Sequence, residues 1–280
     1  MGAGAFNAAT YHQAAATRAA TGQADFAYTE TQRSVPRNQR KASAVLDVNG
    51  VKLRESRDSA EHPESTPIVT LFDVTGSMRA VPVTLQKKLG DLFGILERGS
   101  YVKDPQIMVG AIGDDVYDSV PIQIGQFESD NRVDDQLREV FLEGGGGGDK
   151  REGYALAAHF INEHVETDAW VKRQKKGYLF IIGDELNKDR LYSRSISKWL
   201  GSDDTGEDIA VEAVYEKLKE KWEVFFILPN LTSYYNDSEV ERHWSGLLGE
   251  RFVKLDNPDT VADFIATTIA NHEEALELQA

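Results

Sequence analysis

The chain has 280 residues, which suits one large α/β domain or two small ones. Its 31 Lys and Arg against 46 Asp and Glu give a net charge of −15, so we expect neither nucleic acid nor an anionic membrane as the main partner. The absence of Cys excludes disulfides, thiolate zinc sites and a cysteine nucleophile. No apolar run approaches the roughly 18 residues of a membrane span, and no signal-peptide pattern is present, so a soluble cytoplasmic protein is expected.

Residues 1–43 differ from the rest of the chain in charge and composition. Five basic groups and two acidic ones up to Lys41 give this segment a local positive charge. The stretch from Ala14 to Ala24 is rich in Ala, Thr and Gln, and such a segment buries too little apolar surface to offset its ordering entropy. We therefore predict a flexible basic arm. Alternatively, Phe26, Tyr28 and the basic cluster attach the arm to an acidic partner or to another copy, as in a structural subunit.

Residues 44–64 are predicted to form a β-hairpin and a linker. Val45 to Leu53 alternates apolar and polar residues around Asn49-Gly50, a pair that suits the centre of a type I′ turn. A polar stretch from Arg54 to Thr66 follows. The main domain, residues 65–280, then opens with the apolar strand Ile68–Phe72.

In the main domain, predicted strands alternate with predicted helices, and there is no internal repeat. Further strands are expected at 107–112, 120–124, 177–182, 224–228 and 252–255. Helices are expected from Pro82 to Gly99 and at 131–142, 152–165, 209–222, 243–248 and 258–276. This alternation predicts an α/β fold: a doubly wound, mostly parallel central sheet with helices on both faces.

Two acidic residues end buried strands of this predicted sheet. Asp73 follows Phe72, and Asp184 follows the strand at 177–182. In doubly wound sheets, ligands bind beyond the carboxyl ends of the strands. The loop after Asp73 also carries Thr75 and Ser77, and carboxylate and hydroxyl oxygens are the hard ligands that Mg²⁺, Mn²⁺ and Ca²⁺ prefer. The sequence therefore predicts a divalent-cation site at this edge.

The segment Asp73-Val74-Thr75-Gly76-Ser77 resembles the D-x-[ST]-x-S loop of the von Willebrand factor A domain family, and Asp184 matches the later Asp of the same metal-ion-dependent adhesion site. The resemblance extends over about residues 65–275. The family usually carries a Thr after its glycine-rich second loop, whereas Gly144 to Arg151 holds none. Glu152 is the expected substitute, as in the β-integrin variant, and Asp149 is the second candidate.

This resemblance implies a binding module without turnover. Asp73, Thr75, Ser77, Glu152 and Asp184 would hold Mg²⁺ (or Mn²⁺ or Ca²⁺), and an exposed Asp or Glu of a partner protein would replace one metal-bound water. Intracellular members often act as adaptors beside chaperone-type ATPases of the AAA+ kind or in larger assemblies, so a partner of that kind is implied. Alternatively, Gly144 to Gly148 is a plain linker and Glu152 a first-turn acid that the helix dipole favours.

A second hypothesis is an enzyme. The string from Asp73 to Ser77 also resembles the nucleophile loop of haloacid-dehalogenase-type phosphotransferases, and Gly183 to Asp189 fits their GDxxxxD pattern. Asp73 would then form an aspartyl phosphate, Asp184 and Asp189 would hold Mg²⁺, and a Lys would steady the phosphoryl group. Against this hypothesis, Thr75 stands where such hydrolases need an Asp.

Other candidate residues favour simpler interpretations. Asp114 and Asp115 follow Gly113 between two short strands, which is typical of a turn more than of an accessory cation site. His159 and His164 are five residues apart, so they fall on different faces of a helix and do not form a zinc pair.

Overall fold

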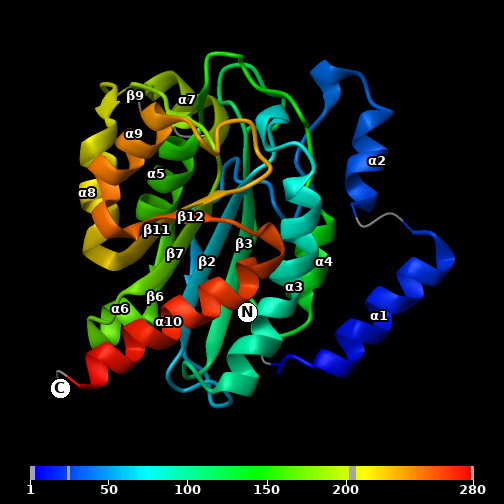
Figure 1. Cartoon of the computed structure of the whole chain (residues 1–280), viewed down its shortest axis with the longest axis vertical. Coiled ribbons are helices and arrows are strands. Elements are labelled where there is room, and N and C mark those ends of the chain that lie inside the picture. The colour runs from blue at the N-terminus through cyan, green and yellow to red at the C-terminus, as the bar shows by residue number, and fades with distance from the viewer. Residues whose placement is uncertain (1–3, 24–25, 202–205, 279–280) are drawn as a thin grey trace.

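The computed structural model describes residues 4–23, 26–201 and 206–278. Within this part of the chain, a central six-stranded sheet has the order β12-β11-β7-β2-β3-β4, and only β4 runs antiparallel to its neighbour (Figure 1). The strands are β2 (Thr66–Asp73), β3 (Pro105–Ile112), β4 (Ile122–Ile124), β7 (Gly177–Ile182), β11 (Trp222–Pro229) and β12 (Phe252–Leu255). The predicted α/β fold with a mostly parallel sheet is confirmed.

Helices cover both faces of this sheet, so its central strands are buried on both sides. Val69 and Leu71 of β2 pack with the helices of one face, while Ile68 and Phe72 pack with those of the other. The first face carries α5 (Tyr154–His164), α7 (Ser193–Leu200), α8 (Val211–Lys221) and α9 (Ser238–Leu248). The second carries α3 (Val81–Gly99), α4 (Arg132–Arg138) and α10 (Val261–Glu277). None of the described helices is long and apolar enough to cross a membrane.

Several short elements were not predicted, and four of them include residues that were expected in helices, namely Glu152, Val165, Ile209 and Pro258. They are α6 (Asp168–Arg173), α7, β1 (Arg54–Ser56), β5 (Arg151–Glu152), β6 (Val165–Thr167), β8 (Leu186–Asn187), β9 (Arg190–Leu191), β10 (Ile209–Ala210) and the 3₁₀ turns η1 (Arg37–Gln39), η2 (Gly76–Met78), η3 (Gly249–Arg251) and η4 (Pro258–Thr260). Most consist of two or three residues, a length at which pairing with a distant segment decides the conformation.

The predicted hairpin at residues 44–53 is wrong, because this segment contains no strand. Leu46 and Val48 are buried in the two different core clusters. The turn at Asn49-Gly50 is fixed by α7, because the Gly50 N–H donates to the carbonyl of Leu200 at 3.1 Å. The alternation in the sequence therefore reflects single side chains that anchor a loop to the core, and not pairing between two strands.

The prediction of a flexible arm is also wrong for its described residues. Helix α1 (Ala8–Thr21) and helix α2 (Ala27–Arg33) lie against the domain on the side of α3 and α4 (Figure 1). Phe6, Tyr11 and Phe26 are buried, and Phe6 stacks on Phe93 of α3 with 5.0 Å between ring centroids. The average composition of the segment hides these few aromatic anchors. Ala24, at the end of the Ala-rich stretch, lies outside the described residues.

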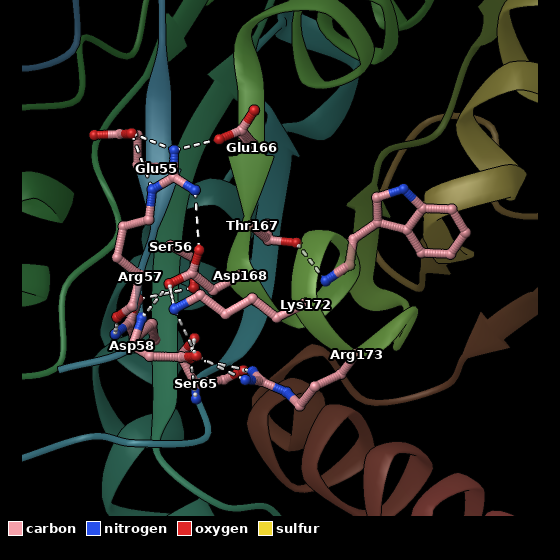
Figure 2. A network of polar contacts seen from close by, with 12 residues as sticks. Glu55, Ser56, Arg57, Asp58, Ser65, Glu166, Thr167, Asp168, Lys172 and Arg173 are labelled. Carbon is pink, nitrogen blue, oxygen red and sulfur yellow. Dashed lines mark hydrogen bonds and ion pairs between the residues drawn. The ribbon is translucent and has the colours of Figure 1, made fainter.

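A polar network fastens β1 to α6 at the edge of the domain (Figure 2). Arg57 contacts Glu55, Glu166 and Asp168, which lie on β1, β6 and α6. Asp58 accepts hydrogen bonds from Arg173 at 2.7 Å and from the Ser65 hydroxyl at 2.8 Å. The network thus joins β1 and α6 to the residue that precedes β2.

Candidate metal centre

Asp73 and Asp184 lie at the point where the strand order of the sheet reverses. The chain leaves β2 for β3 and β4 on one side and later returns to β7, β11 and β12 on the other. Asp73 is the last residue of β2, and Asp184 follows the end of the adjacent strand β7. This switch point is where doubly wound sheets bind ligands. Both acids are buried.

Short hydrogen bonds tie each of the two acids to the first loop. The Thr75 hydroxyl donates to Oδ1 of Asp73 at 2.6 Å, and the Thr75 N–H donates to the same oxygen at 2.7 Å. The Ser77 hydroxyl donates to Oδ1 of Asp184 at 2.7 Å. The 3₁₀ turn η2 carries Ser77 across to Asp184, so residues 107 positions apart in the sequence meet in one site.

The two hydroxyl groups fit a hard cation. Oγ1 of Thr75 and Oγ of Ser77 are 3.1 Å apart, and each has a carboxylate as acceptor for its proton. When both hydroxyl protons are directed at the carboxylates, each oxygen can turn a lone pair toward the same point. Adjacent ligands of an octahedral Mg²⁺ at 2.0–2.1 Å are separated by about 3 Å, so this spacing suits two ligands of one ion.

Glu152 reaches the site from the far side of the glycine-rich loop. Strand β5 pairs with β8 just after Asp184, and this pairing holds Glu152 opposite Asn187. The Glu152 carboxylate is buried, and its Oε2 has no hydrogen-bond partner. A Cβ atom added at Gly146 would lie 3.2 Å from Oε1 of Glu152 and 3.7 Å from Cβ of Thr75. The loop therefore lies between the two predicted ligands, and its glycine leaves room there.

The carboxylates of the site lack cationic partners. Within the described part of the chain, no Lys, Arg or His forms an ion pair with Asp73, Glu152, Asp184 or Glu185. Burial and the charge of Asp184 raise the pKa of Asp73 well above its usual value. Burial and the charge of Asp73 do the same to the pKa of Glu152. Burial also raises the pKa of Asp184. Such a cluster is relieved by a bound cation or by protonation.

Two residues of the site were missed by the sequence analysis, Tyr154 and Glu185. The Tyr154 hydroxyl donates to Oδ2 of Asp73 at 2.5 Å and accepts the N–H of Glu185 at 3.3 Å. Glu185 is buried, and its side chain interacts with Glu152. Glu185 directly follows Asp184, and Tyr154 lies two residues after Glu152, but the sequence alone does not reveal that their side chains turn inward.

The other candidate residues lie elsewhere or have other partners. Asp149 is half exposed and lies 3.7 Å from the Lys188 ammonium. Asp189 is 74% exposed and pairs with Arg151. The phosphotransferase hypothesis requires it to lie in the buried site of Asp73, and it does not. Asp114 accepts the N–H groups of two following residues, the arrangement of a turn. No group of three His, Cys, Asp or Glu side chains in the described residues is arranged as a set of metal ligands, so an ion here would need the hydroxyls of Thr75 and Ser77 as ligands.

His164, the second of the two histidines on α5, has contacts of its own. His164 stacks on Phe160, with 5.1 Å between ring centroids, and its Nδ1 faces the carbonyl of Lys52. These contacts are those of a side chain packed against its own helix and a neighbouring loop.

Comparison with known proteins gives a likeness in fold alone. No family model and no curated protein matches the sequence. The structure is similar to the pilus adhesin SpaC from Lactobacillus rhamnosus GG (TM-score 0.52, 10% identity), covering 78% of this chain and 31% of the adhesin. It also matches BatB from Bacteroides thetaiotaomicron (TM-score 0.47, 10% identity, 75% of this chain and 99% of BatB). A third match is a von Willebrand factor type A protein from Catenulispora acidiphila (TM-score 0.46, 10% identity, 74% and 42%).

These comparisons place proteins of the von Willebrand factor A type among the structures that this chain resembles. The present chain spans about a third of the length of the adhesin. At 10% identity, the likeness concerns the arrangement of the sheet and helices and not the activity.

Proposed function

We propose that this chain is a metal-dependent protein-interaction module of the von Willebrand factor A type. Thr75, Ser77 and Glu152 would hold a Mg²⁺ or Mn²⁺ ion, with Asp73 and Asp184 acting through the hydroxyls. The observation that carries the proposal is the pair of facing hydroxyl oxygens, 3.1 Å apart, beside the unpartnered Oε2 of Glu152. The adhesin-like and von Willebrand-like neighbours support a module that binds without turnover.

The residues of the chain set the chemistry of this site. The bound ion would supply a Lewis-acidic position for an oxygen ligand. Asp73 and Asp184 accept hydrogen bonds from the hydroxyls of Thr75 and Ser77, so their negative charge would stabilise the ion through the hydroxyl groups. Gly76 is exposed and Ser77 is partly exposed, which leaves this side of the site open to solvent. The partner that fits such an open position is a protein with an exposed Asp or Glu. An AAA+-type ATPase or a larger assembly is the partner class that the family resemblance favours, with the cytoplasm as the compartment.

The sharpest test uses Glu152→Gln. If Glu152 is a metal ligand, the variant should be more stable than wild type without metal, whereas a purely structural role predicts that it is less stable. Without metal, replacing a buried carboxylate that has no cationic partner by a neutral amide should raise the free energy of unfolding at neutral pH. With magnesium, the same variant should gain less stability than wild type, which should gain about 2.7 kcal/mol at a concentration of 100 times Kd. Thermal unfolding with and without Mg²⁺ measures both effects.

Two further variants complete the test. Ser77→Ala should lose the response to magnesium and keep the fold, whereas Ser245→Ala, at an exposed position of α9, should respond like wild type. The proposal fails if wild type is not stabilised by Mg²⁺ or Mn²⁺, or if Ser77→Ala is stabilised equally. Anomalous diffraction from a crystal soaked in Mn²⁺ would locate the ion directly.

A further inference from the structure

A shallow hollow of about 480 Å³ lies beside the metal centre, lined by Arg79 and the loop of residues 230–237 between β11 and α9. This loop is bonded to the site itself. The Ser233 N–H donates to the carbonyl of Ser77 at 3.0 Å, and the Tyr234 N–H donates to Oδ2 of Asp184 at 3.1 Å. A ligand that reaches the ion therefore passes next to this hollow.

We propose that the hollow is a second anchoring site for the same partner. In this site, Arg79 binds an acidic side chain of the partner, and Leu231 packs against an apolar side chain of the partner. This inference rests on the proposed function, since it assigns the partner's second contact. The partner segment then carries two acidic residues, one for the ion and one for Arg79, with an apolar residue close to them.

The backbone at Arg79 supports a role beyond folding. Its φ and ψ are 53° and −120°, and those of Ala80 are −90° and −5°, which are the angles of a type II′ turn. The first central position of that turn favours Gly, because a Cβ atom is strained there. Leu231, across the same hollow, also has a positive φ of 73°. Two residues with a strained backbone thus line one hollow beside the site, and backbone strain of this kind clusters at functional positions.

The charge of Arg79 is not compensated within the described chain. Arg79 is exposed and forms no ion pair with a described carboxylate. Asp237, the acidic residue that lines the hollow, is already paired with Lys150 at 3.0 Å and caps α9. A free guanidinium beside a cation site, on a chain with a net charge of −15, complements an acidic ligand.

Leu231 supplies the apolar part of the hollow. Leu231 is 65% exposed, so most of its side chain faces water beside the hollow. The backbone around it is held in place, because Oδ1 of Asn230 accepts the Leu231 N–H at 2.8 Å and the Thr232 hydroxyl donates to the carbonyl of Pro229 at 2.9 Å. An apolar side chain of the partner would remove this leucine from water.

The test selects random displayed peptides on the immobilised full chain, in Mg²⁺ and in a chelator. Wild type should enrich, in Mg²⁺ only, peptides with two acidic residues near an apolar one. Arg79→Gln should enrich peptides with a single required acid and bind a synthetic two-acid peptide about three- to fivefold more weakly. Leu231→Ser should lose the apolar preference. Arg242→Gln, at an exposed arginine of α9 outside the hollow, serves as the matched control and should select like wild type.

Arg79→Gly separates binding from folding. Glycine relieves the strained turn, so this variant should melt no lower than wild type and still lose the second acidic preference. Magnesium alone should stabilise both Arg79 variants as it does wild type. If Arg79→Gln still selects two-acid peptides, or if it loses the response to magnesium, the assignment of the hollow is wrong and the metal-dependent function stands. If wild type enriches no magnesium-dependent peptide, both the hollow and the proposed function fail.

Discussion

The hydroxyl of Tyr154 donates a 2.5 Å hydrogen bond to Oδ2 of Asp73, at the start of α5 and the end of β2 respectively. Thr75 occupies the other oxygen of the same carboxylate. Both oxygens of Asp73 therefore have protein donors, which fits an acid that orients hydroxyl groups and does not suit a free nucleophile. A Cβ atom at Gly183 would lie 2.2 Å from the Tyr154 hydroxyl, so the glycine before Asp184 makes room for this bond.

Tyr154→Phe should lower the free energy of unfolding by about 1–3 kcal/mol. The substitution keeps the ring against Trp244 but leaves Oδ2 of Asp73 and the N–H of Glu185 without their partner. Urea unfolding measures the loss. Tyr235→Phe, which removes a bond to Asp256 from an exposed hydroxyl, should cost less than half as much. An equal cost for the two variants would contradict the importance of the Asp73 bond.

The glycine-rich loop gives a second prediction. Gly145→Ala should destabilise the chain and weaken the response to Mg²⁺, because a Cβ atom at this position would lie 1.9 Å from Oδ1 of Asp118. That oxygen accepts the Gly146 N–H at 3.0 Å and so holds the loop over Glu152. Gly148→Ala meets nothing within 4 Å, so it should cost only the left-handed backbone, about 1 kcal/mol. Thermal unfolding with and without Mg²⁺ compares the two, and equal responses to the metal would support a plain linker.

The fold could be predicted from the sequence because its determinants are local and strong. The strand before Asp73 is a continuous apolar run, and α3 begins with Pro82 in its first turn and ends at Gly99. The loop at residues 44–53 could not be predicted in this way, since the burial of Leu46 and Val48 depends on elements far along the chain. The arm likewise depends on a few contacts, such as Phe6 with Phe93, that its composition does not reveal.

The sequence predicted a set of candidate ligands, and the structure showed which of their side chains contact one another. The strand ends and the spacing of the loop predicted Asp73, Thr75, Ser77 and Asp184 as one set, and the structure shows that the Ser77 hydroxyl bonds to Asp184. The position of Glu152 depends on the short pairing of β5 with β8, which has no periodicity that a sequence can show. For the same reason, the inward turn of Tyr154 and Glu185 needed three-dimensional contacts.

A pH dependence is expected from Asp58 in the network of Figure 2. Burial opposes the charged form, but hydrogen bonds from Arg173 and Ser65 outweigh it and hold the pKa of Asp58 well below its usual value. An acid with a lowered pKa stabilises the fold above its unfolded pKa of about 3.9, and this contribution is lost as the pH falls below that value. Asp58→Asn should therefore cost about 1–2 kcal/mol at pH 7, and the difference from wild type should shrink below about pH 4.

Urea unfolding of both proteins across this pH range is the measurement. Asp259→Asn, at an exposed acid 3.5 Å from Lys88, is the matched control and should show no such convergence. A difference between wild type and Asp58→Asn that is constant from pH 7 to pH 3 would indicate that the charge of Asp58 does not contribute.

The last prediction concerns the N-terminal helices. Phe6→Ala should lower the free energy of unfolding by about 2–4 kcal/mol, because it removes a buried ring from α3 and leaves a cavity beside Phe93. His12→Ala, at a mostly exposed residue of α1 whose ring lies 4.0 Å from Asp91, is the control and should cost much less. If the arm packs on its own domain, as the contacts of Phe6 and the 2.9 Å ion pair of Arg18 with Asp134 indicate, the cost should not depend on protein concentration. Sedimentation and urea unfolding at two concentrations decide this point, since an arm exchanged between copies would give a dimer whose stability rises with concentration.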